Sequence, residues 1–305
     1  MDDTRNFLEN MKEQLSENCP TPTSLLTEDD VTPALAQSPK KLRLPPIIRG
    51  DDFPQQYELE KRPPLVENLF RAKDNVLLGA PSKMGKSWFY ANLAISLASG
   101  RHFCDLEVKK SKVLIIDLEL HRDDALDRLW RIAFEDGHRE IPKDLWLWCL
   151  RDYHYDLDLL ITELDHRLGQ INGVDAIILD PIYMLGDAGF DENNANSVKG
   201  FLQDIAHLKT KHQSALLLSH HFSKGQKGRE SHTDRISGSG AFQRWPDSLI
   251  TLSAHKLQGH AVMEVTGRSM PRVQPWTINM CPPVIRATDL KPEFQTDFKF
   301  KNDRG

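Results

Sequence analysis

Cysteine is scarce in this chain of 305 residues, and no two cysteines form a CxxC pair. The four that occur are far apart in the sequence, at Cys19, Cys104, Cys149 and Cys281. Closely spaced thiols are the usual sign of a zinc site or of a disulfide-stapled extracellular domain. Their absence argues against both classes and favours a reducing compartment, so we expect a cytoplasmic protein.

Long apolar runs and an excess of positive charge are also missing. No run approaches the roughly 18 apolar residues of a membrane span, and the first residues, MDDTRNFLENMKEQL, lack the apolar stretch of an export signal. We therefore expect no membrane association and no export. The formal net charge is −5, so any binding of nucleic acid would depend on a local basic patch.

The first 62 residues differ in composition from the rest of the chain. They are rich in Asp, Glu, Ser, Thr and Gln, and prolines recur from Pro20 to Pro54, with Pro63 and Pro64 directly after them. Such a segment has too little apolar surface to bury, which predicts a largely disordered arm. Within this arm, residues 4–15 fit a short amphipathic helix, which we interpret as a docking segment for a partner protein.

The most informative stretch is residues 75–87, where the apolar run NVLLG leads into APSKMGKS. A strand, a loop of small residues and a helix that begins with Lys-Ser are the pattern of a phosphate-binding loop. Small residues let successive N–H groups face one anion, and the helix adds its positive end. Lys86 would contact the β and γ phosphates of ATP, and Ser87 would bind Mg²⁺. The residues expected at the nucleotide are Ala80, Pro81, Ser82, Lys83, Met84, Gly85, Lys86, Ser87 and Trp88.

The flanks of this loop favour the motif over an ordinary strand-to-helix turn, because apolar residues recur at helical spacing from Phe89 to Ala98 and Gly100 provides an end. Further helices are expected over residues 122–136, 157–168 and 197–212. Strands are expected over residues 113–117, 145–150, 175–180, 215–219, 249–252, 261–266 and 276–280.

Two of the predicted strands lead into carboxylates. Residues 113–117, VLIID, are followed by Glu119, and residues 175–180, DAIILD, end at Asp180. Short apolar runs of this kind predict buried parallel strands, and ligands bind at the carboxyl ends of such strands. Glu119 is therefore a candidate general base, with an exposed glutamate of no catalytic role as the alternative. Asp180 is a candidate Mg²⁺ residue.

The strand over residues 215–219 ends in a pair of histidines, His220 and His221. No Cys or second His pair at ligand spacing accompanies them, which favours a polar sensor of the γ-phosphate over a metal site. A Gly-rich, basic segment follows, residues 222–240, which we call the basic segment. The last predicted strands are expected to extend the sheet in antiparallel fashion, and the sequence GRSMPR between two of them places Arg268 and Arg272 on a loop.

Five stretches occur in order along the chain: APSKMGKSW, VLIIDLEL, IILDPIY, LSHHFSKG and DRISGSGAFQRWPDSLITL. Together they resemble the RecA-type ATPases related to plasmid RepA hexameric helicases, over about residues 63–280. The resemblance implies an α/β, RecA-like P-loop NTPase core, whose mostly parallel sheet is flanked by helices and extended by antiparallel C-terminal strands. It also implies a ring of six subunits, ATP with Mg²⁺ between neighbours, and a central channel for single-stranded DNA.

Matched residue by residue, the resemblance implies Lys86 and Ser87 as the phosphate-loop pair, Glu119 as the catalytic carboxylate and Asp180 as the Mg²⁺ residue. It implies a sensor at His220 and His221. It further implies that Arg268 is an arginine finger offered to the neighbouring subunit's nucleotide, with Arg244 or Arg272 as helpers. Because the chain is acidic overall, we assign DNA binding to the basic segment, with residues 186–196 as the alternative. The candidate DNA-binding residues of the basic segment are Lys224, Lys227, Arg229 and Arg235.

The sequence therefore predicts an ATP-hydrolysing ring motor, a helicase on single-stranded DNA in the replication of a plasmid, phage or mobile element. The arm of residues 1–62 would engage a replication or recombination protein, residues 63–286 would form the ATPase domain, and residues 287–305 a tail. Three alternatives stay open: a recombination or helicase-loading ATPase, an ATP-switched regulatory assembly, and a small-molecule kinase.

Overall fold

The structure is a computed structural model that describes residues 47–54, 62–188, 190–191, 194–221 and 241–295. Its chain divides into two compact units, residues 1–59 and residues 60–305. The described part of the first unit contains a single 3-10 turn, η2 (Gly50–Asp52). Most of the predicted N-terminal arm, including its candidate docking helix, lies outside the described residues. All elements named below belong to the second unit.

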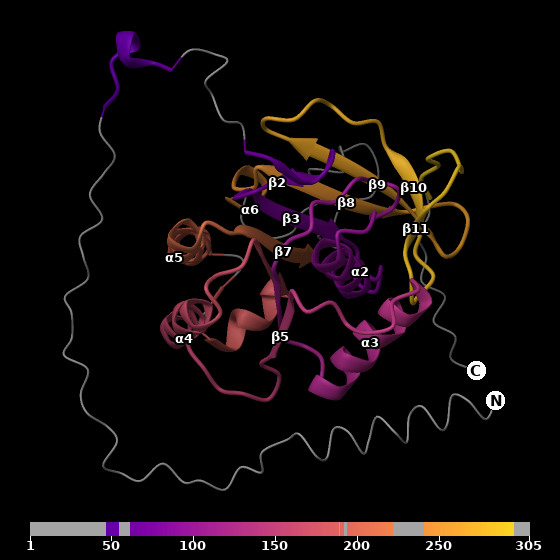
Figure 1. The fold of residues 1–305 in the computed structure, drawn as a ribbon, viewed down its shortest axis with the longest axis horizontal. Helices are drawn as coiled ribbons and strands as arrows, with labels where there is room; N and C mark the ends of the chain where they lie inside the picture. The colour runs from indigo at the N-terminus through magenta and orange to yellow at the C-terminus, as the bar shows by residue number, and fades with distance from the viewer. Residues whose placement is uncertain (1–46, 55–61, 189, 192–193, 222–240, 296–305) are drawn as a thin grey trace, which may run out of the picture. The chain divides into compact units, whose positions relative to one another are not determined.

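A nine-stranded sheet forms the centre of the second unit (Figure 1), in the order β11-β10-β9-β8-β3-β7-β6-β4-β5. Its strands are β3 (Asn75–Ala80), β4 (Val113–Asp117), β5 (Leu145–Cys149), β6 (Ala176–Asp180), β7 (Ala215–His221), β8 (Ser248–Ala254), β9 (His260–Gly267), β10 (Trp276–Asn279) and β11 (Arg286–Ala287). Neighbours from β5 to β8 pair in parallel, and those from β8 to β11 pair antiparallel. The predicted fold class, a mostly parallel sheet with antiparallel C-terminal strands, is confirmed.

Helices cover both faces of this sheet (Figure 1). One core contains α2 (Lys86–Ser99) and α3 (Arg122–Glu135). The other contains α4 (Leu157–Gln170) and α5 (Ala195–His212), together with η4 (Ile182–Ala188) and the short α6 (Ala241–Arg244). No helix in the described ranges is long and apolar enough to cross a membrane. A separate two-stranded sheet, β1 (Pro64–Val66) with β2 (Phe70–Arg71), packs into the first core.

The apolar runs form inner strands because helices shield both of their faces from water. All residues of β4 and β6 are buried, whereas every residue of β5, at the sheet's edge, is half-buried. Alternate residues of a strand face opposite sides. Accordingly, Leu77 of β3 packs with α4 and α5, while its neighbour Leu78 packs with α2.

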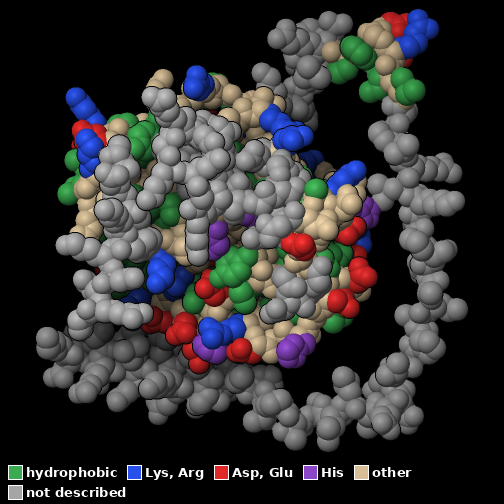
Figure 2. Space-filling model, turned by 180° about the vertical axis from the view of Figure 1, so that it is seen from behind, with side chains coloured by type: hydrophobic (Ala, Val, Ile, Leu, Met, Phe, Trp, Pro, Cys, Tyr) green, Lys and Arg blue, Asp and Glu red, His purple; other side chains and the backbone are tan. Residues whose placement is uncertain are grey.

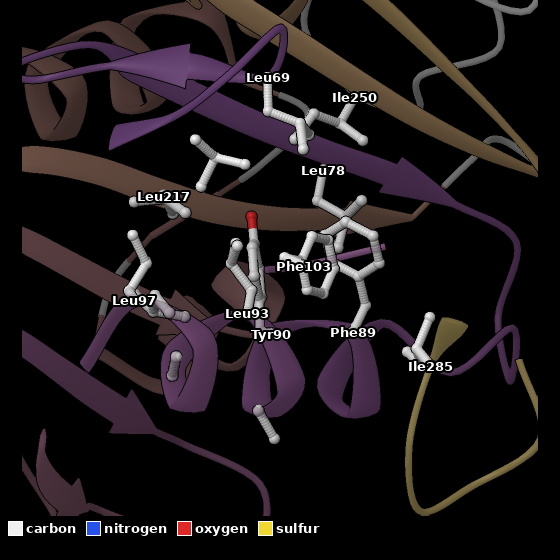
Figure 3. Packing of buried hydrophobic residues seen from close by; sticks show 14 of the residues in the cluster. Leu69, Leu78, Phe89, Tyr90, Leu93, Leu97, Phe103, Leu217, Ile250 and Ile285 are labelled. Atoms are coloured by element: carbon white, nitrogen blue, oxygen red, sulfur yellow. The ribbon is translucent and has the colours of Figure 1, made fainter. Parts of the chain in front are cut away.

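Helix α2 is attached to the sheet by large side chains (Figure 3). Phe89, Tyr90, Leu93 and Leu97 point from α2 toward the strands, and all four are almost completely buried. The Phe89 ring meets the Phe103 ring edge to face, with centroids 5.1 Å apart. The Tyr90 hydroxyl donates a hydrogen bond of 2.7 Å to the Leu218 carbonyl of β7. These contacts hold the first turn of α2, which follows the phosphate loop, against the sheet.

Removing the Phe89 ring should therefore destabilise the ATPase unit strongly. We expect Phe89→Ala to lower the free energy of unfolding by about 3–5 kcal/mol, since a large buried ring leaves a cavity. The matched control is Phe134→Ala on α3, whose ring is 72% exposed and whose loss should change stability by no more than about 0.5 kcal/mol. Urea unfolding measures both. Equal effects would contradict the described packing of α2.

Candidate nucleotide site

The phosphate loop connects β3 to α2 at the carboxyl end of the parallel strands. Gly85, at φ 88°, caps α2 and makes no side-chain cap hydrogen bond. The first N–H groups of the helix thus face the loop, as an anion would require. A Cβ on Gly85 would lie 3.0 Å from Cε of Met280, in a backbone conformation that side chains rarely adopt. Glycine is therefore the residue that this turn accepts.

Lys86 points back into the loop and is buried. Its Nζ lies 3.3 Å from the Ala80 carbonyl oxygen, 3.4 Å from that of Pro81 and 2.8 Å from Nδ1 of His221. Burial lowers the pKa of Lys86 to about 8, although the Asp180 and Glu119 carboxylates act in the opposite direction. Lys86 thus lies between the loop and the end of β7, where a terminal phosphate would add the strongest favourable charge.

Ser87 and Asp180, the predicted Mg²⁺ residues, lie close together in the fold. Both line a cavity of about 20 Å³, shared with Asp117 and Arg128. Asp180 is buried at the end of β6 and accepts a hydrogen bond from the Ser219 hydroxyl. Hydroxyl and carboxylate oxygens are ligands that suit Mg²⁺, which usually binds one or two carboxylates together with phosphates and water. The described residues hold no cluster of three or more His, Cys, Asp or Glu side chains suited to a metal.

Glu119 follows β4 and is exposed. Its backbone N–H donates to Oδ1 of Asp117 at 2.9 Å, and the N–H of Leu120 donates to the same oxygen at 2.8 Å. Burial, the nearby charge of Glu119 and a side-chain hydrogen bond between Glu119 and Tyr183 raise the pKa of Tyr183 to about 12. Asp117 thus holds the backbone at Glu119, and Tyr183 contacts its carboxylate.

The two histidines have different surroundings. His221 is the Cα partner of Ala80 across the β3–β7 pairing, contacts Lys86, and has its ring 5.0 Å from that of Tyr183. His220 is buried, with its ring 4.6 Å from that of Phe242. The geometry thus puts His221 beside the phosphate position and His220 against the second core.

Arg268 lies at the opposite end of the sheet from the phosphate loop of its own chain. Its N–H donates to the Asp247 carbonyl at 2.9 Å, and the N–H of Asp247 donates to the Asn75 carbonyl at 2.7 Å. Asn75 begins β3, and Ala80 ends it. Five residue steps of a strand span about 17 Å. The predicted helpers Arg244 and Arg272 are, like Arg268, exposed.

The four DNA-binding candidates, Lys224, Lys227, Arg229 and Arg235, lie outside the described residues. The alternative segment, residues 186–196, is described only in part.

Sequence reasoning missed three residues that the fold brings to the nucleotide site. Asp117 holds the turn that carries Glu119, and burial raises the pKa of its carboxyl. Tyr183 joins Glu119 to His221. Arg128 of α3 lies 4.5 Å above the Trp88 ring and is attracted by Asp117 and Asp180. Only Asp117 had a visible signal, as the acidic last residue of an apolar run.

Fold and site together define a P-loop nucleotide-binding protein. Comparison with protein families matches residues 38–227 to the AAA domain, which is more than half of the chain. The chain therefore belongs to this family of P-loop ATPases. The match includes Lys86, Glu119, Asp180 and His221, and it ends before Arg268. No curated protein matches the chain.

The lowered pKa of Lys86 predicts a pH dependence of nucleotide binding. Below about pH 8 the side chain is charged and can bind phosphate, whereas above it each binding event must first add a proton. We expect the affinity for Mg–ATP to be level near pH 7 and to fall toward about tenfold per pH unit above pH 8. Titration calorimetry between pH 7 and 9.5 measures this.

The matched control for the pH experiment is Lys86→Arg, whose guanidinium stays charged throughout this range. The affinity of this variant for Mg–ATP, whether high or low, should not change with pH. A level affinity in the unchanged protein would show that Lys86 does not lose its proton in the unliganded site.

Proposed function

We propose that this ATPase works as a ring in which each nucleotide is bound by the phosphate loop of one subunit and completed by Arg268 of the next. The observation that carries this proposal is the position of Arg268 at the far end of β3. About 17 Å of buried strand separates its anchor from the phosphate loop, so Arg268 is too distant to serve its own nucleotide directly. In a head-to-tail ring, opposite surfaces of the subunits meet at every interface.

Within each site the residues would divide the work of phosphoryl transfer. Lys86 and the N-terminus of α2 would bind the phosphates, and Ser87 with Asp180 would hold Mg²⁺, whose charge would offset that of the phosphates. Glu119 would accept a proton from the attacking water. Asp117 and Tyr183 hold Glu119 in place. Arg268 of the neighbour stabilises the charge that develops on the transferred group. Hydrolysis therefore depends on assembly.

We further propose that the motor acts on single-stranded DNA, as a helicase in the replication of a plasmid, phage or mobile element. The order of motifs, which resembles plasmid RepA hexameric helicases, supports this proposal. On the described part of the face in Figure 2, both acidic and basic side chains are visible. The attraction for DNA would come from Lys224, Lys227, Arg229 and Arg235.

Mixing two inactive variants tests the shared site. Arg268→Ala should lower turnover by about 10³ to 10⁵, in the range that arginine fingers contribute, and Lys86→Ala should be inactive because it cannot hold the phosphates. In a one-to-one mixed ring, about a quarter of the interfaces join an intact loop to an intact Arg268, so turnover should reappear. ATP turnover of the mixture measures this.

Mass measurement must show that the two variants assemble together. The control is Arg131→Ala on the exposed part of α3, which should keep full turnover. If a co-assembled mixture stays silent, Arg268 is structural or acts within its own chain.

Salt dependence tests the DNA segment. Each phosphate contact on a single strand contributes about −0.7 to the slope of log affinity against log salt, so replacing Lys224, Lys227 and Arg229 by Ala should flatten the slope by about 2. Replacing the exposed Lys143, Lys199 and Lys291 is the matched control and should leave the slope unchanged. Fluorescence anisotropy with an oligonucleotide measures both. An unchanged slope in the first variant would move the DNA site to another segment.

Strand displacement separates the proposed helicase from its rivals. Unwinding of a forked duplex with DNA-stimulated turnover supports a helicase. DNA-stimulated turnover without unwinding would instead favour a recombination or loading ATPase. ATP turnover that does not change when DNA is added would favour an ATP-switched regulatory assembly.

A further inference from the structure

Charged side chains gather at the amino end of β3, opposite the phosphate loop. Asp74 is buried, and its Oδ1 lies 2.6 Å from Nη1 of Arg62. Lys209 of α5 is also buried, and its Nζ donates to the Lys73 carbonyl at 2.7 Å and to Oδ1 of Asn75 at 2.6 Å. Buried charges are costly unless they are paired and hydrogen-bonded, so this cluster constrains the chain segments that it joins.

Asp247 links this cluster to the segment that carries Arg268. Its carboxylate Oδ2 accepts the Asn75 N–H at 2.9 Å, and its own N–H donates to the Asn75 carbonyl at 2.7 Å. Its carbonyl accepts the Arg268 N–H at 2.9 Å. Asp74 and Lys209 also act on each other and on Asp247 electrostatically. Three hydrogen bonds thus hold Asp247 between the first residue of β3 and Arg268.

The segment beyond this anchor turns sharply. We call residues 268–272, between β9 and β10, the arginine loop. A Cβ on Gly267 would lie 2.6 Å from Cε and 3.1 Å from Cβ of Met270, so Met270 folds back over the last residue of β9. The backbone bond from the Arg268 N–H to the Asp247 carbonyl continues the β8–β9 ladder by one residue, and the loop leaves the sheet from there.

We propose that Asp247 is a positioning residue for hydrolysis in the neighbouring subunit: its carboxylate bonds the Asn75 N–H and so fixes the backbone carbonyl that accepts the Arg268 N–H, where Arg268 leaves the sheet. This inference rests on the proposed ring mechanism. Lys209 supports Asp247 from α5 by holding the same end of β3 through Asn75. Asp247 touches no nucleotide, and its effect passes through Arg268 alone.

Mixing experiments separate this role from support of the chain's own phosphate loop. Asp247→Ala keeps an intact phosphate loop but loses the carboxylate bond to the Asn75 N–H, which would free the backbone of residue 247 and so misplace Arg268. Mixed with Lys86→Ala it should regain turnover, and mixed with Arg268→Ala it should stay silent. If Asp247 mainly supports the phosphate loop through β3, the pattern reverses, and that reversal would overturn the proposal. The matched control is Asp204→Ala, an exposed position on α5, which should keep full turnover.

Hydrogen exchange gives a readout that does not depend on hydrolysis. In the full chain, Asp247→Ala should speed exchange severalfold in peptides that cover residues 266–272 and leave those that cover residues 76–99 unchanged. Equal acceleration of both segments would mean general loosening and would overturn the inference. If the reference mixture of Arg268→Ala with Lys86→Ala is silent, the ring mechanism fails, and the exchange result alone decides the role of Asp247.

A conservative variant covers the case in which Asp247→Ala does not fold. Asp247→Asn keeps an oxygen that can accept the Asn75 N–H and loses the charge. It should lose less turnover than Asp247→Ala and show the same mixing pattern. Full turnover and unchanged exchange in Asp247→Asn, beside an unfolded Asp247→Ala, would overturn the proposal.

Discussion

Strand β3 is the element on which the rest of the structure depends. It lies inside the sheet, bonded to β7 on one side and β8 on the other, and five of its six residues are buried. Its carboxyl end opens into the phosphate loop, and its amino end is bonded to Asp247, which holds Arg268. A strand paired on both edges cannot shift without breaking both ladders. The two ends therefore keep a fixed separation, and the chain has one surface for nucleotide and another for Arg268.

The electrostatics of the nucleotide site follow from a second constraint, the burial of Lys86. A buried ammonium needs acceptors, and the chain supplies the Ala80 and Pro81 carbonyls and Nδ1 of His221. Asp180 and Glu119 add negative charge nearby without cancelling the cost of burial, since the pKa of Lys86 is still lowered to about 8. A bound phosphate would give the Lys86 ammonium an anionic partner in place of these acceptors. The site thus favours the ligand that its loop geometry fits.

Much of the fold was predictable because its strongest signals are local. Residues 113–117 and 175–180 are short apolar runs that end in carboxylates, and each became an inner strand with its acidic residue at the nucleotide end. The antiparallel extension was predictable from separated apolar runs. By contrast, the pairing of Arg128 with Trp88, the bond of Tyr183 to Glu119 and the anchoring of Arg268 by Asp247 join residues distant in sequence. No local pattern distinguishes these residues from others on a helix or turn, so only the folded chain reveals them.

In the proposed ring, one chain would carry halves of two different catalytic sites. ATP turnover per subunit, measured over a wide range of protein dilution beside the mass of the assembly at each concentration, tests it most directly. If the sites are shared between subunits, turnover per subunit should fall as the assembly dissociates and become negligible where the monomer dominates. Constant turnover per subunit in a solution shown to be monomeric would contradict it.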